Sequence, residues 1–176
     1  MTLLALVSRA LEAHGVAHAV IGAAALAVHG VSRATADIDL LVTDPRCFDS
    51  AVWAPVEAAG AAVDMRRGDA DDPLAGVIRI SRGEDPPVDV IAGRSTWQTA
   101  IMARAVPTAV AGASVPIAAP ADVVLLKLYA GGPQDAWDIA QLLDAAPSIE
   151  PLVDAALSAL PVECAALWRR IRDRRA

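Results

Sequence analysis

The sequence predicts an α/β fold, in which a mixed sheet with flanking helices precedes a small helical C-terminal lobe. Two observations carry this prediction. Short apolar segments bounded by turn residues crowd residues 16–92, whereas residues 95–176 show almost only helical patterns. Strands followed by helices are typical of a sheet unit with a helical lobe packed on it. We therefore expect a core over residues 1–105 and a mainly helical lobe over residues 106–176.

The individual elements follow from apolar periodicity and from turn residues. Strands are expected at residues 16–21, 38–42, 61–65, 76–81 and 88–92. Helices are expected at residues 2–14, 22–29, 48–59, 95–104, 121–130, 134–144, 148–159 and 162–172. Gly15, Gly30 and Gly60 each follow an expected helix, which is where glycine often ends one. The strand at 88–92 is expected to pair with the strand before it.

Hydrophobic residues make up 55% of the chain but aromatic residues only 3%, so the core must be aliphatic. The longest uncharged apolar stretch, residues 105–121, is interrupted by Pro107 and Pro116 and closes with Pro120. A membrane-spanning helix needs about 20 apolar residues with an unbroken backbone ladder. This stretch does not meet that need, and we expect a soluble protein with no membrane partner.

The first 15 residues carry Arg9 and Glu12 and lack a basic leading region, unlike a signal peptide. Two cysteines, Cys47 and Cys164, provide neither a disulfide framework nor a metal-ligand spacing. A cytoplasmic location is the expectation.

The net charge of −6 is unevenly distributed. Residues 169–176 hold five arginines and one aspartate, which leaves ten basic against twenty acidic residues in the rest of the chain. An acidic body would not attract nucleic acid through its overall field. A polyanion would have to be held by bound cations or by this C-terminal segment. The alternative is that the arginines form a solvated helix end, where cations suit the helix dipole.

Three aspartates carry the expected chemistry. Asp37 and Asp39 stand at positions i and i+2 of an apolar strand pattern, so both side chains leave the same face. Asp89 interrupts the apolar strand at 88–92 in the same way. If the two strands are neighbours, three carboxylates converge, and such oxygen clusters suit Mg²⁺ or Mn²⁺. Alternatively, Asp37 caps a turn, Asp39 pairs with an arginine, and Asp89 lies on an exposed edge.

A phosphate-binding turn is expected upstream of these carboxylates. Gly22 ends a strand and opens a helix, and such a junction presents free N–H groups to a phosphate chain. Arg33, four residues before Asp37, can reach the same phosphates with its planar guanidinium.

These motifs together resemble the DNA polymerase β-type nucleotidyltransferase superfamily. The matching segments are Gly22, Arg33, Asp37-Ile38-Asp39 and Val88-Asp89-Val90, followed by Lys127 and by Asp135-Ala136-Trp137-Asp138. Within the superfamily, the sequence is most similar to the abortive-infection (AbiEii-type) nucleotidyltransferases, over most of residues 18–145. It departs from them at the phosphate turn, where Gly22-Ala23 replaces Gly-Gly or Gly-Ser, so a side-chain hydroxyl is lost.

The resemblance implies a nucleotidyltransferase-type fold and transfer of a nucleoside monophosphate from an NTP to a hydroxyl acceptor. Asp37, Asp39 and Asp89 would bind Mg²⁺ or Mn²⁺ and be catalytic, together with Lys127. The nucleotide would be bound by Gly22, Ala23, Arg33, Lys127 and Asp135. Some family members are toxins of toxin–antitoxin pairs and a few extend tRNA, which implies tRNA as an acceptor and a cognate antitoxin as a partner.

Alternatives remain open at this stage. Lys127 lies in an apolar helix, where a lysine that reaches out to solvent is ordinary, and Asp135 fits the first turn of a helix. The acceptor can also be a small cationic molecule such as an aminoglycoside, attracted by the acidic loop at residues 68–72. A third reading is a catalytically silent relative that binds a nucleotide or a partner protein, as the altered Gly22-Ala23 turn allows.

Overall fold

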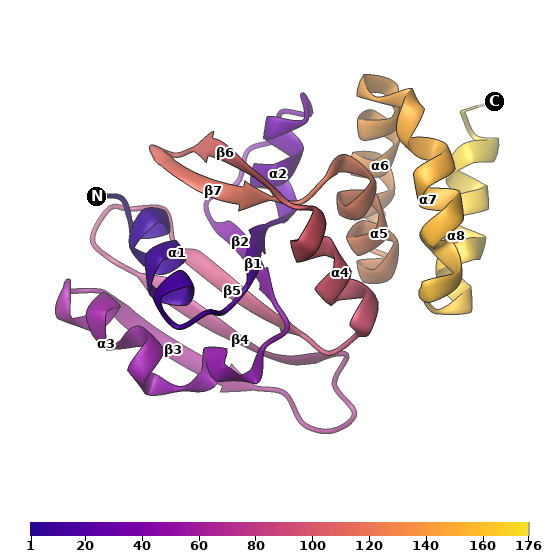
Figure 1. Cartoon of the computed structure of the whole chain (residues 1–176). Coiled ribbons are helices and arrows are strands. Elements are labelled where there is room, and N and C mark those ends of the chain that lie inside the picture. The colour runs from indigo at the N-terminus through magenta and orange to yellow at the C-terminus, as the bar shows by residue number, and fades with distance from the viewer. Residues whose placement is uncertain (176) are drawn as a thin grey trace. The chain divides into compact units, whose positions relative to one another are not determined.

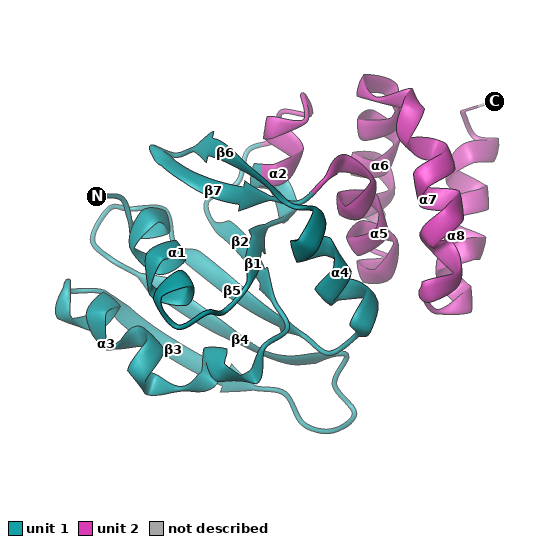
Figure 2. Ribbon diagram, viewed as in Figure 1, with its two compact units in different colours: residues 1–24, 34–118 teal, residues 25–33, 119–176 magenta. Residues whose placement is uncertain are grey.

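The computed structural model describes residues 1–175, which belong to two compact units. Residues 1–24 and 34–118 form one unit, here called the sheet unit. Residues 25–33 and 119–176 form the other, here called the helical unit (Figure 2). Among the described residues, every helix is too short or too polar to cross a membrane.

The sheet unit is built on a seven-stranded mixed sheet in the order β3-β4-β5-β2-β1-β7-β6 (Figure 1). Its strands are β1 (His18–Val20), β2 (Ile38–Val42), β3 (Ala62–Arg67), β4 (Leu74–Ser81), β5 (Val88–Gly93), β6 (Val106–Val110) and β7 (Ala113–Ile117). β2 is parallel to β5 and β1 is parallel to β7, while the other neighbouring strands are antiparallel. The predicted α/β fold with a mixed sheet is confirmed, as is the pairing of residues 88–92 with the preceding strand.

One face of this sheet is apolar and lies under helices. Because side chains alternate along a strand, every second residue of β2, β4 and β5 points to this face. The residues concerned are buried: Ile38, Leu40, Val42, Ile78, Ile80, Val88, Val90 and Ala92. Helix α1 (Leu3–Ala13) contacts β5 and β7, and α3 (Ser50–Ala58) contacts α1 and β3. The intervening residues of the same strands point to the opposite face, which is where the aspartates lie.

Residues 106–117 correct the expectation of an almost wholly helical second half. They form the β6–β7 hairpin, in which Pro107 is opposite Pro116. Proline lacks an N–H donor and is therefore tolerated near the edge of a sheet, and β6 is the edge strand here. Ala111 and Gly112, both with positive φ, form the two-residue turn that closes the hairpin. The hairpin joins the sheet because β7 pairs with β1.

Two expected helices also need correction. The helix expected at 48–59 begins at Ser50, because Asp49 caps it by accepting a hydrogen bond from the backbone N–H of Ala51. A 3₁₀ turn at Pro45–Phe48 precedes it. The helix expected at 148–159 is divided into a 3₁₀ turn, α7 (Glu150–Ala156) and a second 3₁₀ turn.

In the helical unit, α5 (Pro120–Ala130) contacts α6 (Pro133–Ala145), α7 and α8 (Val162–Asp173). The core of the helical unit is mostly aliphatic and includes one tryptophan. Its buried residues include Val124, Leu128, Ile139, Leu142, Val153 and Trp168. Gly131 ends α5 in the left-handed region, with a φ of 69°, as expected for a glycine after a helix. Two further helices follow strands of the sheet unit: α2 (Gly22–Val28) follows β1, and α4 (Thr96–Arg104) follows β5.

Candidate active site

A row of four charged side chains crosses the sheet on the face opposite to its apolar core residues. Strand register places Asp64 of β3 opposite Arg79 of β4, Arg79 opposite Asp89 of β5, and Asp89 opposite Asp39 of β2. Arg79, Asp89 and Asp39 alternate with buried apolar positions of their strands, so they lie on the face opposite to the core. Asp64 lies on the same face because it is directly opposite Arg79. β2 and β5 pair in parallel, so the strands of Asp39 and Asp89 are neighbours, which is the condition for their carboxylates to converge.

Arg79 neutralises part of this row. Its Nη1 lies 2.8 Å from Oδ2 of Asp89 and 3.9 Å from Oδ2 of Asp37. Asp37 directly precedes β2, and its Oδ1 accepts a hydrogen bond of 2.9 Å from the hydroxyl of Thr35. The Arg79 guanidinium therefore lies close both to Asp89 of β5 and to Asp37, the residue before β2.

Asp89 is the most desolvated of these paired carboxylates. Its side chain is 15% exposed, and Oδ1 is buried without a hydrogen-bond partner among the described residues. Burial raises the pKa of Asp89, the Arg79 charge opposes that shift, and the Asp37 charge adds to it. A carboxylate with an unsatisfied buried oxygen is suited to accepting a cation or a proton.

Gly22 is held tightly against Asp39. A β-carbon at position 22 would overlap Oδ2 of Asp39, and the φ of Gly22 is +62°. Position 22 therefore requires glycine for two reasons, the positive φ and the close approach of the Asp39 carboxylate. The next residue, Ala23, is 7% exposed and lies in the first turn of α2. The predicted phosphate turn therefore lies beside the predicted metal ligand Asp39.

The donor set fits a hard divalent cation in kind. Asp37, Asp39 and Asp89 offer only carboxylate oxygens, which Mg²⁺ and Mn²⁺ prefer, and Asp89 Oδ1 has an unused lone pair. Within residues 1–175, however, no three acidic, histidine or cysteine side chains are already gathered closely enough to hold an ion. The guanidinium of Arg79 lies within 4 Å of both Asp37 and Asp89.

Arg33, Lys127 and Asp135 meet in the helical unit, around Asp138. Nζ of Lys127 lies 2.6 Å from Oδ2 of Asp138 and 2.9 Å from Oδ1 of Asp135. Nη1 of Arg33 lies 3.1 Å from the same Asp138 oxygen. Asp138 is fully buried and Lys127 is 8% exposed, so this lysine does not reach out to solvent. Asp135 also accepts a hydrogen bond from the N–H of Gly132 at the start of α6, as an acidic first-turn residue can.

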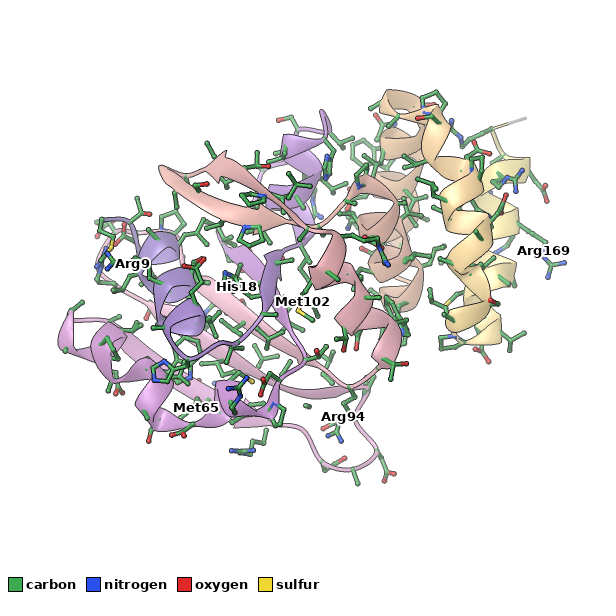
Figure 3. The ribbon with its side chains drawn as sticks, viewed as in Figure 1. Arg9, His18, Met65, Arg94, Met102 and Arg169 are labelled. Atoms are coloured by element: carbon green, nitrogen blue, oxygen red, sulfur yellow. The ribbon has the colours of Figure 1, made fainter. Side chains whose placement is uncertain are left out.

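A hollow of about 520 Å³ adjoins the carboxylate row within the sheet unit. It extends from Asp89 and Arg79 across Val77 to the loop between β3 and β4. Arg66, Arg67, Asp64 and Asp72 also line it, so the hollow has an apolar floor with charges of both signs around it. Arg94, labelled in Figure 3, donates to the backbone carbonyls of Gly68 and Asp69 and ties this loop to the end of β5.

The C-terminal arginines are partly engaged within the helical unit. Arg172 pairs with Glu150 and Asp154, and Arg175 pairs with Asp144. Arg169, by contrast, is exposed on α8 and points away from the other helices of the unit (Figure 3). The segment is thus in part a structural clamp between α8 and the acidic residues of α6 and α7.

Sequence reasoning missed Arg79 and gave Asp138 no role. Arg79 is the only charged residue in the pattern Gly76–Ser81, which marks it as facing away from the core. Nothing in the sequence states that β4 lies between β3 and β5 in the register that brings it to Asp89. Asp138 carried a signal, since it stands one helical turn after Asp135 on the same helix.

No protein-family model and no curated protein sequence matches this chain. Solved structures do match it. The solution structure of the antibiotic-resistance factor ANT(2'')-Ia is 18% identical, covers 98% of this chain and 90% of that chain, and has a TM-score of 0.54. The crystal structure of ANT(2'')-Ia in complex with adenylyl-2''-tobramycin is 18% identical, covers 99% and 97% of the two chains, and has a TM-score of 0.52.

The chain has the nucleotidyltransferase fold. This conclusion rests on the two ANT(2'')-Ia structures, which match over nearly the full length of both chains. An antigenic nucleotidyltransferase-like protein from Paracoccidioides brasiliensis is also similar, with 16% identity, coverage of 95% and 96%, and a TM-score of 0.46.

Proposed function

We propose that this chain is a metal-dependent nucleotidyltransferase that moves a nucleoside monophosphate from an NTP to a hydroxyl acceptor. The observation that carries the proposal is the pairing of Asp39 with Asp89 on adjacent parallel strands, with Gly22 pressed against Asp39. It occurs in a chain whose fold is that of nucleotidyltransferases. A sheet face with carboxylates on neighbouring strands is suited to phosphate chemistry that needs divalent cations.

In this proposal, Asp37, Asp39 and Asp89 hold Mg²⁺ or Mn²⁺. Divalent cations bound there would neutralise the triphosphate and the departing pyrophosphate. Asp89 orients the attacking hydroxyl and accepts its proton, a role that suits a carboxylate with a raised pKa and a free oxygen. Gly22 and the N–H groups that open α2 contact the phosphates, because glycine alone lets the backbone approach Asp39 this closely.

Ala23, Arg33, Lys127 and Asp135 keep their predicted roles at the nucleotide. Arg33 and Lys127 are held by Asp138, which fixes their cationic groups and limits the entropy lost when they bind a phosphate. Asp135 shares Lys127 and orients its ammonium group. Ala23 contributes only its backbone N–H, since its side chain is buried and has no hydroxyl.

Two acceptor classes follow from different observations. The resemblance to abortive-infection nucleotidyltransferases favours tRNA as the acceptor and a cognate antitoxin as a partner. A small cationic acceptor is favoured by the structural likeness to ANT(2'')-Ia, whose complex contains adenylyl-2''-tobramycin. The acidic body of the chain also favours a cation, and Arg172 and Arg175 are already paired with acidic residues.

The test is incubation with each labelled NTP and Mg²⁺ in the presence of tRNA, protein or aminoglycoside acceptors. Label transferred to tRNA supports the toxin-type activity, and label transferred to an aminoglycoside supports the antibiotic-type activity. NTP binding without transfer to any acceptor would contradict the enzyme proposal and support a catalytically silent relative. The Asp39→Asn variant serves as the matched negative control.

A further inference from the structure

The Arg79 guanidinium contacts Asp37 and Asp89, two of the three carboxylates that would hold a divalent cation. We propose that Arg79 is an internal counter-ion: it neutralises Asp89 while no cation is bound, and it must leave that carboxylate before a divalent cation binds. Arg79 thereby weakens the affinity of the site for metal. This inference rests on the proposed function, since it concerns the same carboxylates.

The contacts of Arg79 support this role. One nitrogen, Nη1, lies 2.8 Å from Oδ2 of Asp89 and 3.9 Å from Oδ2 of Asp37, so a single group interacts with two of the three candidate metal ligands. The pairing of β4 with β5 places Arg79 opposite Asp89, and the pairing of β5 with β2 places Asp89 opposite Asp39. The same carboxylate oxygens cannot bind both the guanidinium and a divalent cation at full strength, because the two positive charges repel each other.

The burial of the two partners differs in the way that a displaceable counter-ion requires. The Asp89 side chain is 15% exposed, whereas the Arg79 side chain is 51% exposed. A carboxylate this desolvated needs a positive partner whenever it is ionised. The arginine, in contrast, keeps half of its surface in water and can move away without a large desolvation cost.

A second position for the guanidinium is available on the other side of the strand. Arg79 is opposite Asp64 as well as Asp89, and both aspartates line the same hollow as Arg79. Asp64 is 55% exposed and is paired with Arg66 at 2.8 Å, an exposed pair that exchanges partners easily. Arg79 can therefore turn from Asp89 toward Asp64 without losing all carboxylate contact.

The experiment is titration of the full chain with Mn²⁺ alone, by calorimetry and by the metal-dependent rise in melting temperature. Arg79→Met removes the charge and keeps most of the apolar stem. It is expected to bind Mn²⁺ at least about tenfold more tightly than the wild type. The repulsion between a unit charge and a divalent charge about 4 Å apart is large enough to change the dissociation constant by this factor. Arg82→Met is the matched control: it removes an equal charge just beyond the end of β4, where Arg82 pairs with Asp85 outside the carboxylate row, and should change the affinity less than about twofold.

Two further variants keep the test decisive. Arg79→Lys retains the positive charge and is expected to stay close to the wild-type affinity, even if Arg79→Met is less stable. Adding Asp89→Asn to Arg79→Met should abolish the gain. Equal Mn²⁺ affinities in the wild type and Arg79→Met would overturn the counter-ion role but leave the proposed function standing. Absence of Mn²⁺ binding in both proteins would instead overturn the metal site itself, and with it this inference.

Discussion

The carboxylate of Asp39 lies so close to Gly22 that a β-carbon on residue 22 would overlap its Oδ2. Gly22 also has a φ of +62°, in a region that other residues rarely adopt. A turn residue and a strand carboxylate, 17 positions apart in the sequence, are therefore packed as one unit. Substitution at either position is expected to affect the other.

Gly22→Ala should lower the free energy of unfolding by about 2–4 kcal/mol, because backbone strain is added to a steric clash. Gly60→Ala is the matched control. Gly60 has a φ of +82° but no atom within 4 Å of an added β-carbon, so only the strain of about 1–2 kcal/mol should be seen. Urea unfolding measures both. A loss for Gly22→Ala no greater than that for Gly60→Ala would show that Asp39 does not press on residue 22.

Asp138→Ala should destabilise the chain by about 3–5 kcal/mol, since it leaves the buried ammonium of Lys127 with one carboxylate and removes the partner of Arg33. Asp144→Ala, which removes an exposed partner of Arg175 on the same helix, should cost less than about 1 kcal/mol. Chemical unfolding of both variants checks this. Similar losses would mean that the network around Asp138 is not a buried one in solution.

His18 is expected to make stability depend on pH. Figure 3 labels its side chain on β1; it is buried beside α1, with Nε2 2.7 Å from Oγ of Ser8. Burial lowers its pKa below the ordinary value of 6.5, while the backbone carbonyl of Val16 and the charge of Glu12 partly oppose this. The unfolded chain then binds more protons, so the free energy of unfolding should fall as the pH drops from about 7 to about 5.

His18→Gln should flatten this pH dependence. Ser8→Ala should keep it while losing about 1 kcal/mol of stability, because burial and not the hydroxyl is the main cause of the shift. Urea unfolding over the same pH range gives both slopes. An unchanged slope in His18→Gln would assign the pH dependence to other groups.

Both thiols should be unreactive in the folded protein. Burial, with the charge of Asp44 adding to it, raises the pKa of Cys47 to about 11, and burial also raises the pKa of Cys164. At about pH 8 the thiolate fraction of Cys47 is then very small, and access is blocked as well. A colorimetric thiol reagent should detect both groups only after unfolding. Rapid reaction of the native protein would contradict the burial of these side chains.

Much of the sheet could be predicted from local pattern. Residues 38–42 form an apolar run ended by Asp44-Pro45, and β2 covers the same residues. The β6–β7 hairpin could not be predicted, because Pro107 and Pro116 hide the strand pattern and their tolerance depends on an edge position set by the whole sheet.

The carboxylates of the candidate site could be predicted from the sequence, but the charged partners that contact the candidate residues could not. Asp39 and Asp89 stand out because each interrupts an apolar strand. Arg79 matters only because β4 pairs with β5 in one register, and a shift of one residue would send it to the other face. The position of Lys127 in an apolar helix is ordinary for a lysine, and only the family resemblance gave Lys127 a role. Its buried partner Asp138 lies on another helix, and that contact is a property of helix packing.

The most direct test of the carboxylate row is Mg²⁺-dependent transfer of label from an NTP labelled at the α-phosphate. Wild type, Asp39→Asn, Asp89→Asn and Asp85→Asn should be compared with the same acceptors. Asp85 pairs with Arg82 in the loop before β5, outside the row, and is the matched charge control. Loss of transfer in Asp39→Asn and Asp89→Asn, by about 100-fold or more, with near wild-type transfer in Asp85→Asn is the predicted result. Wild-type transfer by Asp39→Asn and Asp89→Asn would contradict the assignment of this sheet face as the active site.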